Sequence, residues 1–133
     1  LFMNGVLDLS LPENKLSGQI IERAIYVHKN LGPGLLEKAY EEALVHFLKQ
    51  DGLSVIQQPL LPVEIEGLRI DAGFRPDLIV NDTIIIELKS VEQLRPIHQA
   101  QLMTYLKLSG LNLGLLMNFN VALLKDGIKR IVL

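Results

Sequence analysis

The sequence predicts a single domain of the α/β class. With 133 residues, the chain has the length of one ordinary domain. A hydrophobic fraction of 49% and a charged fraction of 21% are enough for a compact core and argue against disorder. Apolar residues recur at helical spacing in some stretches and form extended runs in others, and glycine or proline separates many of them. We therefore expect helices and strands to alternate within one unit.

The N-terminal part is expected to hold an arm and a first helix. Residues 1–13 show no clear hydrophobic periodicity, so we predict an N-terminal arm over residues 1–16, with a short edge strand as the alternative. The single domain is expected to cover residues 17–133. Its first helix is predicted over residues 17–31, where apolar residues recur at helical spacing and Ser17 is a suitable N-cap.

A second helix is predicted over residues 35–50, between the helix-breaking sequence Gly32-Pro33-Gly34 and Gly52. Glu37 falls in its first turn. An acidic side chain there can simply satisfy free backbone N–H groups and the helix dipole, and a role in a site is the open alternative. The expected buried face consists of Leu36, Tyr40, Ala43, Leu44 and Phe47.

The middle of the chain is expected to be extended. Residues 53–64 predict one strand with irregularities at Pro59 and Pro62, because proline cannot donate a ladder hydrogen bond. Glu66-Gly67 should turn the chain into a short strand near residues 68–71.

The C-terminal part adds one helix and two strands. The helix is expected to carry Pro96 in its first turn and to end at Gly110. A strand is predicted over residues 111–118, followed by a turn at Asp126-Gly127 and a final strand over residues 128–133.

Between these parts, residues 75–89 predict a strand, a tight turn and a second strand with charges at unusual positions. Asp77 opens the first apolar run, and Glu87 and Lys89 close the second. Charged groups beside such runs are costly to bury unless they are paired or bind a metal. Because strand side chains alternate between faces, Glu87 and Lys89 should share one face.

The register of this hairpin decides whether the charges meet. A two-residue turn at Asn81-Asp82 would place Asp77 opposite Ile86. A three-residue connection pairs Leu78 with Ile86 and Asp77 with Glu87, and it stacks apolar residues on apolar residues. We predict the second register, because burial of one face fixes strand register. The two carboxylates would then have Cβ atoms about 5 Å apart.

Two carboxylates at that distance repel one another, so they favour a shared proton or a cation between them. Lys89 alone could supply the positive charge, but a divalent metal suits the oxygen-rich arrangement better. Other chemistries lack their residues. No Lys follows Gly32-Pro33-Gly34 as a phosphate-binding loop requires, no Gly-x-Ser-x-Gly elbow occurs, and the absence of cysteine excludes thiol nucleophiles and thiolate zinc sites.

The three histidines are scattered and lack the spacing of zinc ligands. His28 lies near the apolar stripe of the first helix, where we expect a packed or capping side chain, with a site role as the alternative. The other two are His46 and His98.

Charge and hydropathy exclude several classes of protein. The net charge of −2 is not that of a tight nucleic-acid binder. Residues 1–74 carry 6 Lys and Arg against 10 Asp and Glu, whereas residues 75–133 carry 7 against 5, so a polyanion should meet the second half. The apolar runs are far shorter than a membrane span, and no secretion leader is visible. We expect a cytoplasmic protein without a membrane partner, in keeping with the lack of cysteine.

Several motifs together resemble the PD-(D/E)XK nuclease superfamily. Asp77 after Pro76, followed by Glu87-x-Lys89, resembles its signature, and Gln101-x-x-x-Tyr105 resembles a flanking motif of the RecB-like and lambda-exonuclease-like branch. Gly34-Leu-Leu-Glu37-Lys-Ala-Tyr40 resembles the signature of the GxxExxY family within this superfamily. Further stretches similar to that family are Val27-His28, Arg75-x-Asp77, Ala100-Gln101-Leu-x-Thr-Tyr105, Asn118-Phe-Asn120 and Asp126-Gly127-Ile128-Lys-Arg130. The resemblance covers roughly residues 17–133.

The resemblance implies a fold and a reaction. The fold would be a restriction-endonuclease-like core, with a mixed central β-sheet flanked by helices on both sides. The reaction would be Mg²⁺- or Mn²⁺-dependent hydrolysis of phosphodiester bonds, in DNA more than in RNA. The catalytic residues would be Asp77, Glu87, Lys89 and Glu37, with Lys89 orienting the attacking water; the metal ligands would be Asp77, Glu87 and Glu37; and the substrate-binding residues would be Gln101, Tyr105 and Arg75. A homodimer or a partner protein would extend the small surface available to a duplex.

Two alternatives remain open from the sequence. One is a catalytically silent binding or assembly module that keeps the nuclease-like fold and motif. The other is a structural charge cluster in which Lys89 neutralises Asp77 and Glu87, and in which Glu37 points away from Asp77.

Overall fold

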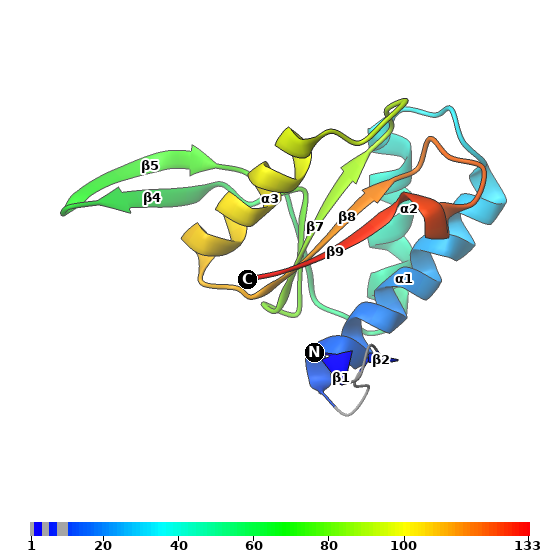
Figure 1. Ribbon diagram of the computed structural model, residues 1–133, viewed down its shortest axis with the longest axis horizontal. Coiled ribbons are helices and arrows are strands. Elements are labelled where there is room, and N and C mark those ends of the chain that lie inside the picture. Colours follow the sequence, from blue (N-terminus) through cyan, green and yellow to red (C-terminus); the bar gives the residue numbers. More distant parts are fainter. Residues whose placement is uncertain (1, 4–5, 8–10) are drawn as a thin grey trace.

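The computed structural model describes residues 2–3, 6–7 and 11–133, and it shows a mixed sheet between two layers of helices (Figure 1). The sheet has five strands in the order β3-β6-β7-β8-β9. β7 and β8 are parallel, with α3 as the connection between them, and the other neighbours are antiparallel. The strands are β3 (Val55–Gln57), β6 (Leu78–Val80), β7 (Ile84–Lys89), β8 (Leu113–Asn118) and β9 (Ile128–Val132).

The two faces of this sheet are covered by different helices. α1 (Pro12–Leu31) and α2 (Glu37–Gln50) pack on one face, and α3 (Pro96–Ser109) packs on the other. Alternate residues of β7 divide between two apolar clusters: Ile84 and Ile86 face α1 and α2, whereas Ile85 faces α3. The expected α/β class and restriction-endonuclease-like architecture are confirmed.

The beginning of the first helix was predicted wrongly. α1 begins at Pro12, and Ser17 lies inside it as a buried residue whose Oγ donates to the Asn14 carbonyl at 2.9 Å. The fixed φ of a proline in the first turn suits a helix start without a side-chain cap. The predicted arm over residues 1–16 therefore overlaps α1. Ahead of it, β1 (Phe2–Met3) pairs with β2 (Val6–Leu7), and residues 1, 4–5 and 8–10 of that arm lie outside the described residues.

α2 begins at Glu37, after the predicted start of this helix. Leu36 stands before the first turn and is 81% exposed, so its assignment to the buried face was wrong. Tyr40, Leu44 and Leu48 carry the buried face instead.

The predicted strand over residues 53–64 is divided between two sheets. β3 belongs to the central sheet, and β4 (Leu61–Ile65) pairs with β5 (Leu68–Phe74) in a two-stranded ribbon. Gln58 separates β3 from β4, because its φ of 51° ends the extended backbone just before Pro59. We call this hairpin the β4–β5 ribbon, and Figure 1 shows it projecting from the body of the molecule.

The β6–β7 hairpin has the predicted register. Leu78 pairs with Ile86 and Val80 with Ile84, so residues 81–83 form a three-residue connection. Asn81 and Asp82 adopt left-handed backbone angles, with φ of 51° and 50°, which these two residue types tolerate better than most.

The remaining turn, η1 (Leu124–Gly127), precedes β9 and includes the predicted turn at Asp126-Gly127. In the described part of the chain, none of the helices combines the length and the apolar character needed to cross a membrane.

Candidate active site

Asp77 and Glu87 meet where β6 begins and β7 approaches its end. Glu87 is only 4% exposed, and the register places Asp77 one step beyond the pair Leu78–Ile86, opposite Glu87. The Asp77 backbone N–H donates to Glu87 Oε1 at 3.0 Å. The Leu88 backbone N–H donates to Asp77 Oδ2 at 2.8 Å. The backbone of each strand thus orients the carboxyl group of the other.

The electrostatics of this pair favour a shared proton. Burial, and next the charge of Asp77, raise the pKa of Glu87 to about 8. Burial is also the main reason why the pKa of Asp77 lies above its ordinary value, and the charge of Glu41 adds to it. At neutral pH the two carboxyl groups therefore retain one proton between them, which is the state expected for two close carboxyls without a cation.

Lys89 lies on the same face of β7 as Glu87, two residues further along the strand. Its charge lowers the pKa of both carboxyl groups, although burial outweighs this effect. Among the described residues, Lys89 forms no ion pair with either carboxylate. Lys89 is thus a half-buried cation that acts on both carboxyl groups electrostatically and not by direct contact.

Tyr105 of α3 completes this face. Its ring packs against Phe74 with the centroids 5.0 Å apart. Burial, followed by the charges of Glu87 and Asp77, raises the pKa of its hydroxyl, so the phenol lies within electrostatic range of the carboxyl pair. Tyr105 remains a neutral hydrogen-bond donor over the physiological pH range.

Gln101 and Arg75 have exposed side chains and lie close in sequence to Tyr105 and Asp77. Gln101 lies one turn before Tyr105 on α3, and Arg75 lies two residues before Asp77. Within the described chain, neither side chain forms a hydrogen bond or ion pair that fixes its position. Both side chains are exposed to solvent.

Glu37 occupies a different position from the carboxyl pair. It is exposed, and its Oε2 accepts a hydrogen bond from the Ser90 backbone N–H at 3.3 Å, just after Lys89. Across the described residues, no three His, Cys, Asp or Glu side chains gather closely enough to hold a metal ion. The structure therefore brings Asp77 and Glu87 together, whereas the Glu37 carboxylate is bound to the Ser90 backbone N–H.

Glu41 is the acidic residue of α2 whose charge reaches Asp77, and the sequence interpretation missed it. Its carboxylate is buried and accepts hydrogen bonds from the side-chain amides of Gln57, at 2.6 Å, and Gln58, at 3.1 Å. Lys38 approaches it at 3.5 Å. The available signal was helical spacing: Glu41 follows Glu37 by four residues and adjoins Tyr40, the centre of the buried face.

The Gly34-x-x-Glu37-x-x-Tyr40 motif builds the loop that leads to the site. The Tyr40 hydroxyl donates to the Gly32 carbonyl at 2.6 Å and accepts from the Leu35 N–H at 3.0 Å. Its ring stacks on Phe119 with a centroid distance of 4.5 Å. The Leu35 carbonyl in turn accepts from Ser90 Oγ at 2.7 Å. Tyr40 thereby connects the loop before α2 to the residue that follows Lys89.

Asn118, at the end of β8, fixes the other side of this segment. Its side-chain amide is buried and binds both backbone groups of Val91, at 3.0 Å and 2.9 Å. The Phe119 N–H donates to the Lys89 carbonyl at 2.9 Å. Lys89 therefore stands on a segment that is held from two sides, although the sequence interpretation gave Asn118 no such role.

Two of the three histidines have structural roles. His28 is buried, and its Nε2 lies 3.1 Å and 2.8 Å from the carbonyl oxygens of Phe119 and Val121, which confirms the packed or capping interpretation. His98 accepts from the Arg95 backbone N–H at 3.0 Å in the capping box of α3.

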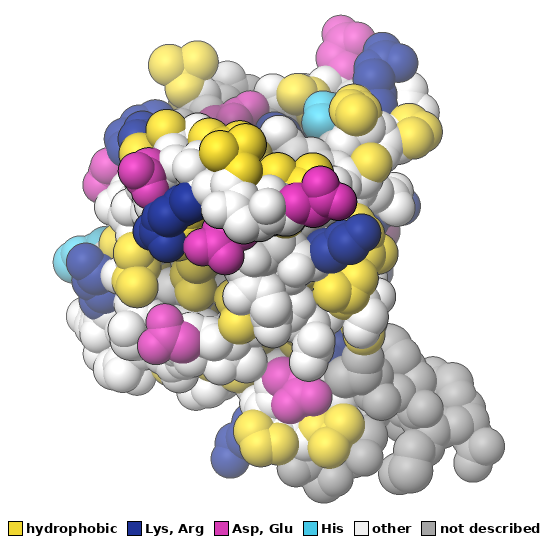
Figure 2. Space-filling model, turned by 90° about the vertical axis from the view of Figure 1, so that its left-hand side faces the viewer, with side chains coloured by type: hydrophobic (Ala, Val, Ile, Leu, Met, Phe, Trp, Pro, Cys, Tyr) yellow, Lys and Arg dark blue, Asp and Glu magenta, His cyan; other side chains and the backbone are white. Residues whose placement is uncertain are grey.

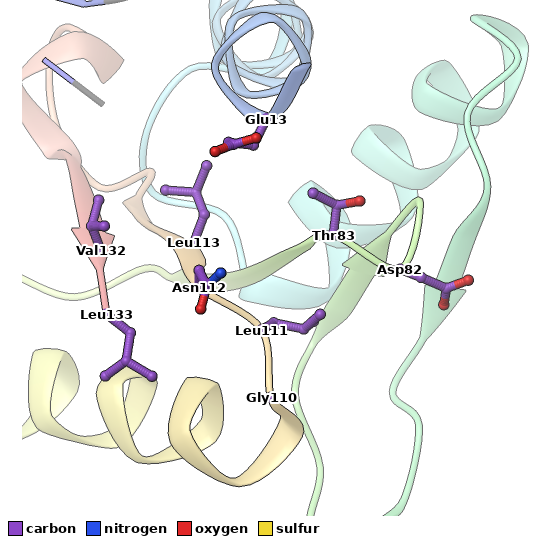
Figure 3. A pocket seen from close by; sticks show the side chains of 9 residues that line it. All are labelled: Glu13, Asp82, Thr83, Gly110, Leu111, Asn112, Leu113, Val132 and Leu133. Carbon is purple, nitrogen blue, oxygen red and sulfur yellow. The ribbon is translucent and has the colours of Figure 1, made fainter. Parts of the chain in front are cut away.

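The cavity shown in Figure 3 lies at the opposite end of the sheet from Lys89. It has a volume of about 370 Å³ and is bordered by Thr83, just before β7, by Leu113, at the start of β8, and by Val132, at the end of β9. The Glu13 side chain points toward Leu113, whereas the Asp82 carboxylate points away. Asp77 and Glu87 do not line this cavity.

Comparison with known protein families gives one match. The family model described as "PD-(D/E)XK nuclease superfamily" matches residues 14–131, which is nearly the whole chain. Neither the curated proteins nor the solved structures include a match to this chain.

Proposed function

Since the chain belongs to the PD-(D/E)XK nuclease superfamily, we propose that it is a metal-dependent nuclease that hydrolyses phosphodiester bonds in DNA. The observation that supports this most strongly is the pairing of Asp77 with the buried Glu87, each oriented by the backbone of the other strand, two residues before Lys89. Within the superfamily, the motif around Gly34, Glu37 and Tyr40 supports membership of the GxxExxY family and of the RecB-like branch.

The carboxyl pair fits a divalent cation. Mg²⁺ is commonly bound by one or two carboxylates together with water and phosphate oxygens, so Asp77 and Glu87 suffice as protein ligands. The shared proton marks the place where positive charge is needed, and a cation would replace it. When bound, Mg²⁺ or Mn²⁺ would lower the pKa of a coordinated water molecule and neutralise negative charge on the phosphate.

The neighbouring residues have distinct roles in this proposal. Lys89 orients the attacking water and binds the scissile phosphate, for which its half-buried amine is available. Tyr105 donates a hydrogen bond to the substrate or braces Lys89. Gln101 and Arg75 contact the DNA backbone from the exposed rim. Glu37 completes the metal shell through water, after a rotation of its exposed side chain away from the Ser90 N–H.

The first experiment measures cleavage of linear and circular DNA by the purified chain with Mg²⁺ or Mn²⁺. Glu87→Ala and Lys89→Ala should each reduce the rate by about 100-fold or more, which is the loss typical of removing one catalytic electrostatic group. Glu64→Gln, an exposed carboxylate of β4, is the matched control and should keep the wild-type rate. Cleavage that survives both site substitutions would contradict the mechanism.

A second candidate is the catalytically silent binding or assembly module. The position of Glu37 favours it, because Asp77 and Glu87 lack a third acidic ligand in the described chain. Calorimetric titration with Mn²⁺ separates the two. The nuclease proposal expects binding by the wild type and at least tenfold weaker binding by Asp77→Asn, whereas the silent module expects no binding by either.

The acidic balance of the chain leaves little basic surface for a duplex. A homodimer would extend the surface available to a duplex, and a nucleic-acid-binding partner would supply basic groups. We propose a cytoplasmic setting, which the lack of cysteine supports.

A further inference from the structure

The β4–β5 ribbon has an apolar face that is exposed to solvent. The register places Ile65 beside Leu68 and Val63 beside Ile70, so all four side chains lie on one face. Ile65 and Leu68 are each 60% exposed, and Ile70 is 45% exposed. Figure 2 views the molecule from the side on which the ribbon projects, and hydrophobic side chains lie among charged ones there. An isolated two-stranded ribbon is marginally stable, and it gains most from additional strands.

The outer edge of β5 has free backbone groups at defined positions. The ribbon turns at Glu66 and Gly67, whose φ angles of 46° and 82° are those of a two-residue hairpin turn. Such a turn closes on a hydrogen-bonded pair, here Ile65–Leu68, and hydrogen-bonded and non-hydrogen-bonded pairs then alternate. The N–H and C=O groups of Arg69, in the next pair Glu64–Arg69, consequently point away from β4, toward the free edge. Beyond Val63–Ile70 the pairing with β4 is irregular as far as Leu61–Phe74.

We propose that β5 pairs in antiparallel fashion with β5 of a second copy of this chain, around a two-fold axis at Ile70. In this register Ile70 faces Ile70 of the second copy, and Leu68 faces Ala72. Arg69 then lies directly opposite Asp71 of the second copy, and the outward backbone groups of Arg69 are available for hydrogen bonds across the interface. The side-chain charges thus select this register, and the backbone direction at Arg69 is compatible with it.

The order of charges along β5 indicates that the binding partner is a second copy of this chain. A strand with opposite charges at equal distances on both sides of its centre is complementary to itself when paired antiparallel. Arg69 already lies 2.7 Å from Asp71 in its own strand and 3.5 Å from Glu64 on β4, so the dimer would extend an alternating cluster. The ribbon carries Glu64, Glu66 and Asp71 against the single cation Arg69, which disfavours a nucleic acid as the occupant.

A cysteine placed on the axis tests the register directly, because the chain has no cysteine of its own. Ile70→Cys should form a cross-linked dimer under mild oxidation, since directly opposed residues of a non-hydrogen-bonded pair have Cβ atoms about 4.5 Å apart. Leu68→Cys is the matched control. Its two copies would lie roughly 13 Å apart along the strands, too far for a disulfide.

A charge swap tests the same surface without oxidation. Sedimentation analysis should show a wild-type dimer that Arg69→Asp and Asp71→Arg each weaken by roughly 10- to 100-fold, because both opposed pairs become repulsive. The double variant R69D/D71R should recover the dimer, and so should an equimolar mixture of the two single variants. A role confined to ion pairs within one chain predicts no rescue by mixing.

A wild type that stays monomeric up to millimolar concentration would overturn the proposal. So would equal cross-linking of Ile70→Cys and Leu68→Cys. If the charge variants changed DNA affinity and left the oligomeric state unaltered, the ribbon would be a nucleic-acid contact instead. None of these outcomes depends on nuclease activity, so the dimer and the proposed function can fail separately.

Discussion

The chain contains two antiparallel hairpins whose surroundings differ in almost every respect. In β6–β7, every strand residue up to Leu88 is buried, and helices cover both faces. In the β4–β5 ribbon, the residues of β5 are exposed as far as Gly73, and only Phe74 is buried. The two hairpins share one type of secondary structure, so their difference shows what tertiary packing adds to it.

The two hairpins also differ in how their charged side chains are paired. The exposed ribbon pairs Arg69 with two acidic side chains. The buried hairpin holds Asp77 and Glu87 side by side without a cation in direct contact. Like charges are inexpensive on a surface and costly inside, which is why the Asp77–Glu87 pair retains a proton; such a pair supports the proposed metal-binding function. Charged side chains on an exposed strand edge usually oppose pairing with other chains, so it is the self-complementary order of Arg69 and Asp71 that supports the proposed association.

The largest expected difference between the hairpins is in stability. Ile85→Ala should lower the free energy of unfolding by about 2–5 kcal/mol, because it leaves a cavity between β7 and α3. Ile65→Ala, at the exposed end of the ribbon, should change it by less than about 0.5 kcal/mol. Urea denaturation at a concentration where the chain is monomeric measures both. Similar losses for the two variants would mean that the ribbon is packed in solution.

The two hairpins should also differ, by a smaller amount, in how they make the free energy of unfolding depend on pH. In the metal-free protein, Glu87 titrates at about 8 in the folded state and near its ordinary value of 4.5 when unfolded. Between these values the folded state binds more protons, so the free energy of unfolding should fall as the pH rises from about 5 to about 8.

Thermal unfolding across this range measures that slope. Glu87→Gln should flatten it, and Glu64→Gln on the ribbon should leave it as in the wild type. A stability that rises with pH over the same window would contradict the shared proton.

The smallest effect concerns the ion pairs of the ribbon. Arg69→Gln should change the free energy of unfolding of the monomer by less than about 0.5 kcal/mol, since exposed ion pairs contribute little. The same substitution should weaken self-association measurably. A loss well above that value in the monomer would assign the charges to the stability of the ribbon itself.

The sequence was sufficient for the register of β6–β7, because apolar residues on both strands allow only one pairing that buries them. It was insufficient for residues 53–64, where a single left-handed residue, Gln58, sends two similar segments into different sheets. It also missed the start of α1, because Ser17 satisfies a local capping pattern while tertiary packing continues the helix to Pro12.

The sequence likewise predicted some features of the candidate site and missed others. The pairing of Asp77 with Glu87 and the approach of Tyr105 follow from strand alternation and motif order. The division of roles between Glu37 and Glu41 does not, because helical spacing defines a face but not how the helix is rotated against the sheet. Asn118 was missed for a related reason: its contacts with Val91 join segments distant in sequence.

The hydrogen bonds of the Tyr40 hydroxyl affect how the sequences of related proteins can be interpreted. It joins Gly32 to Leu35 through hydrogen bonds that the fold needs whether or not any phosphate is cleaved. A chain that lost Glu87 or Lys89 would still depend on Tyr40 for the entry to α2. The tyrosine of the glycine–glutamate–tyrosine motif is therefore a marker of architecture, whereas under the proposed function the Asp77, Glu87 and Lys89 positions would distinguish an active enzyme from a scaffold.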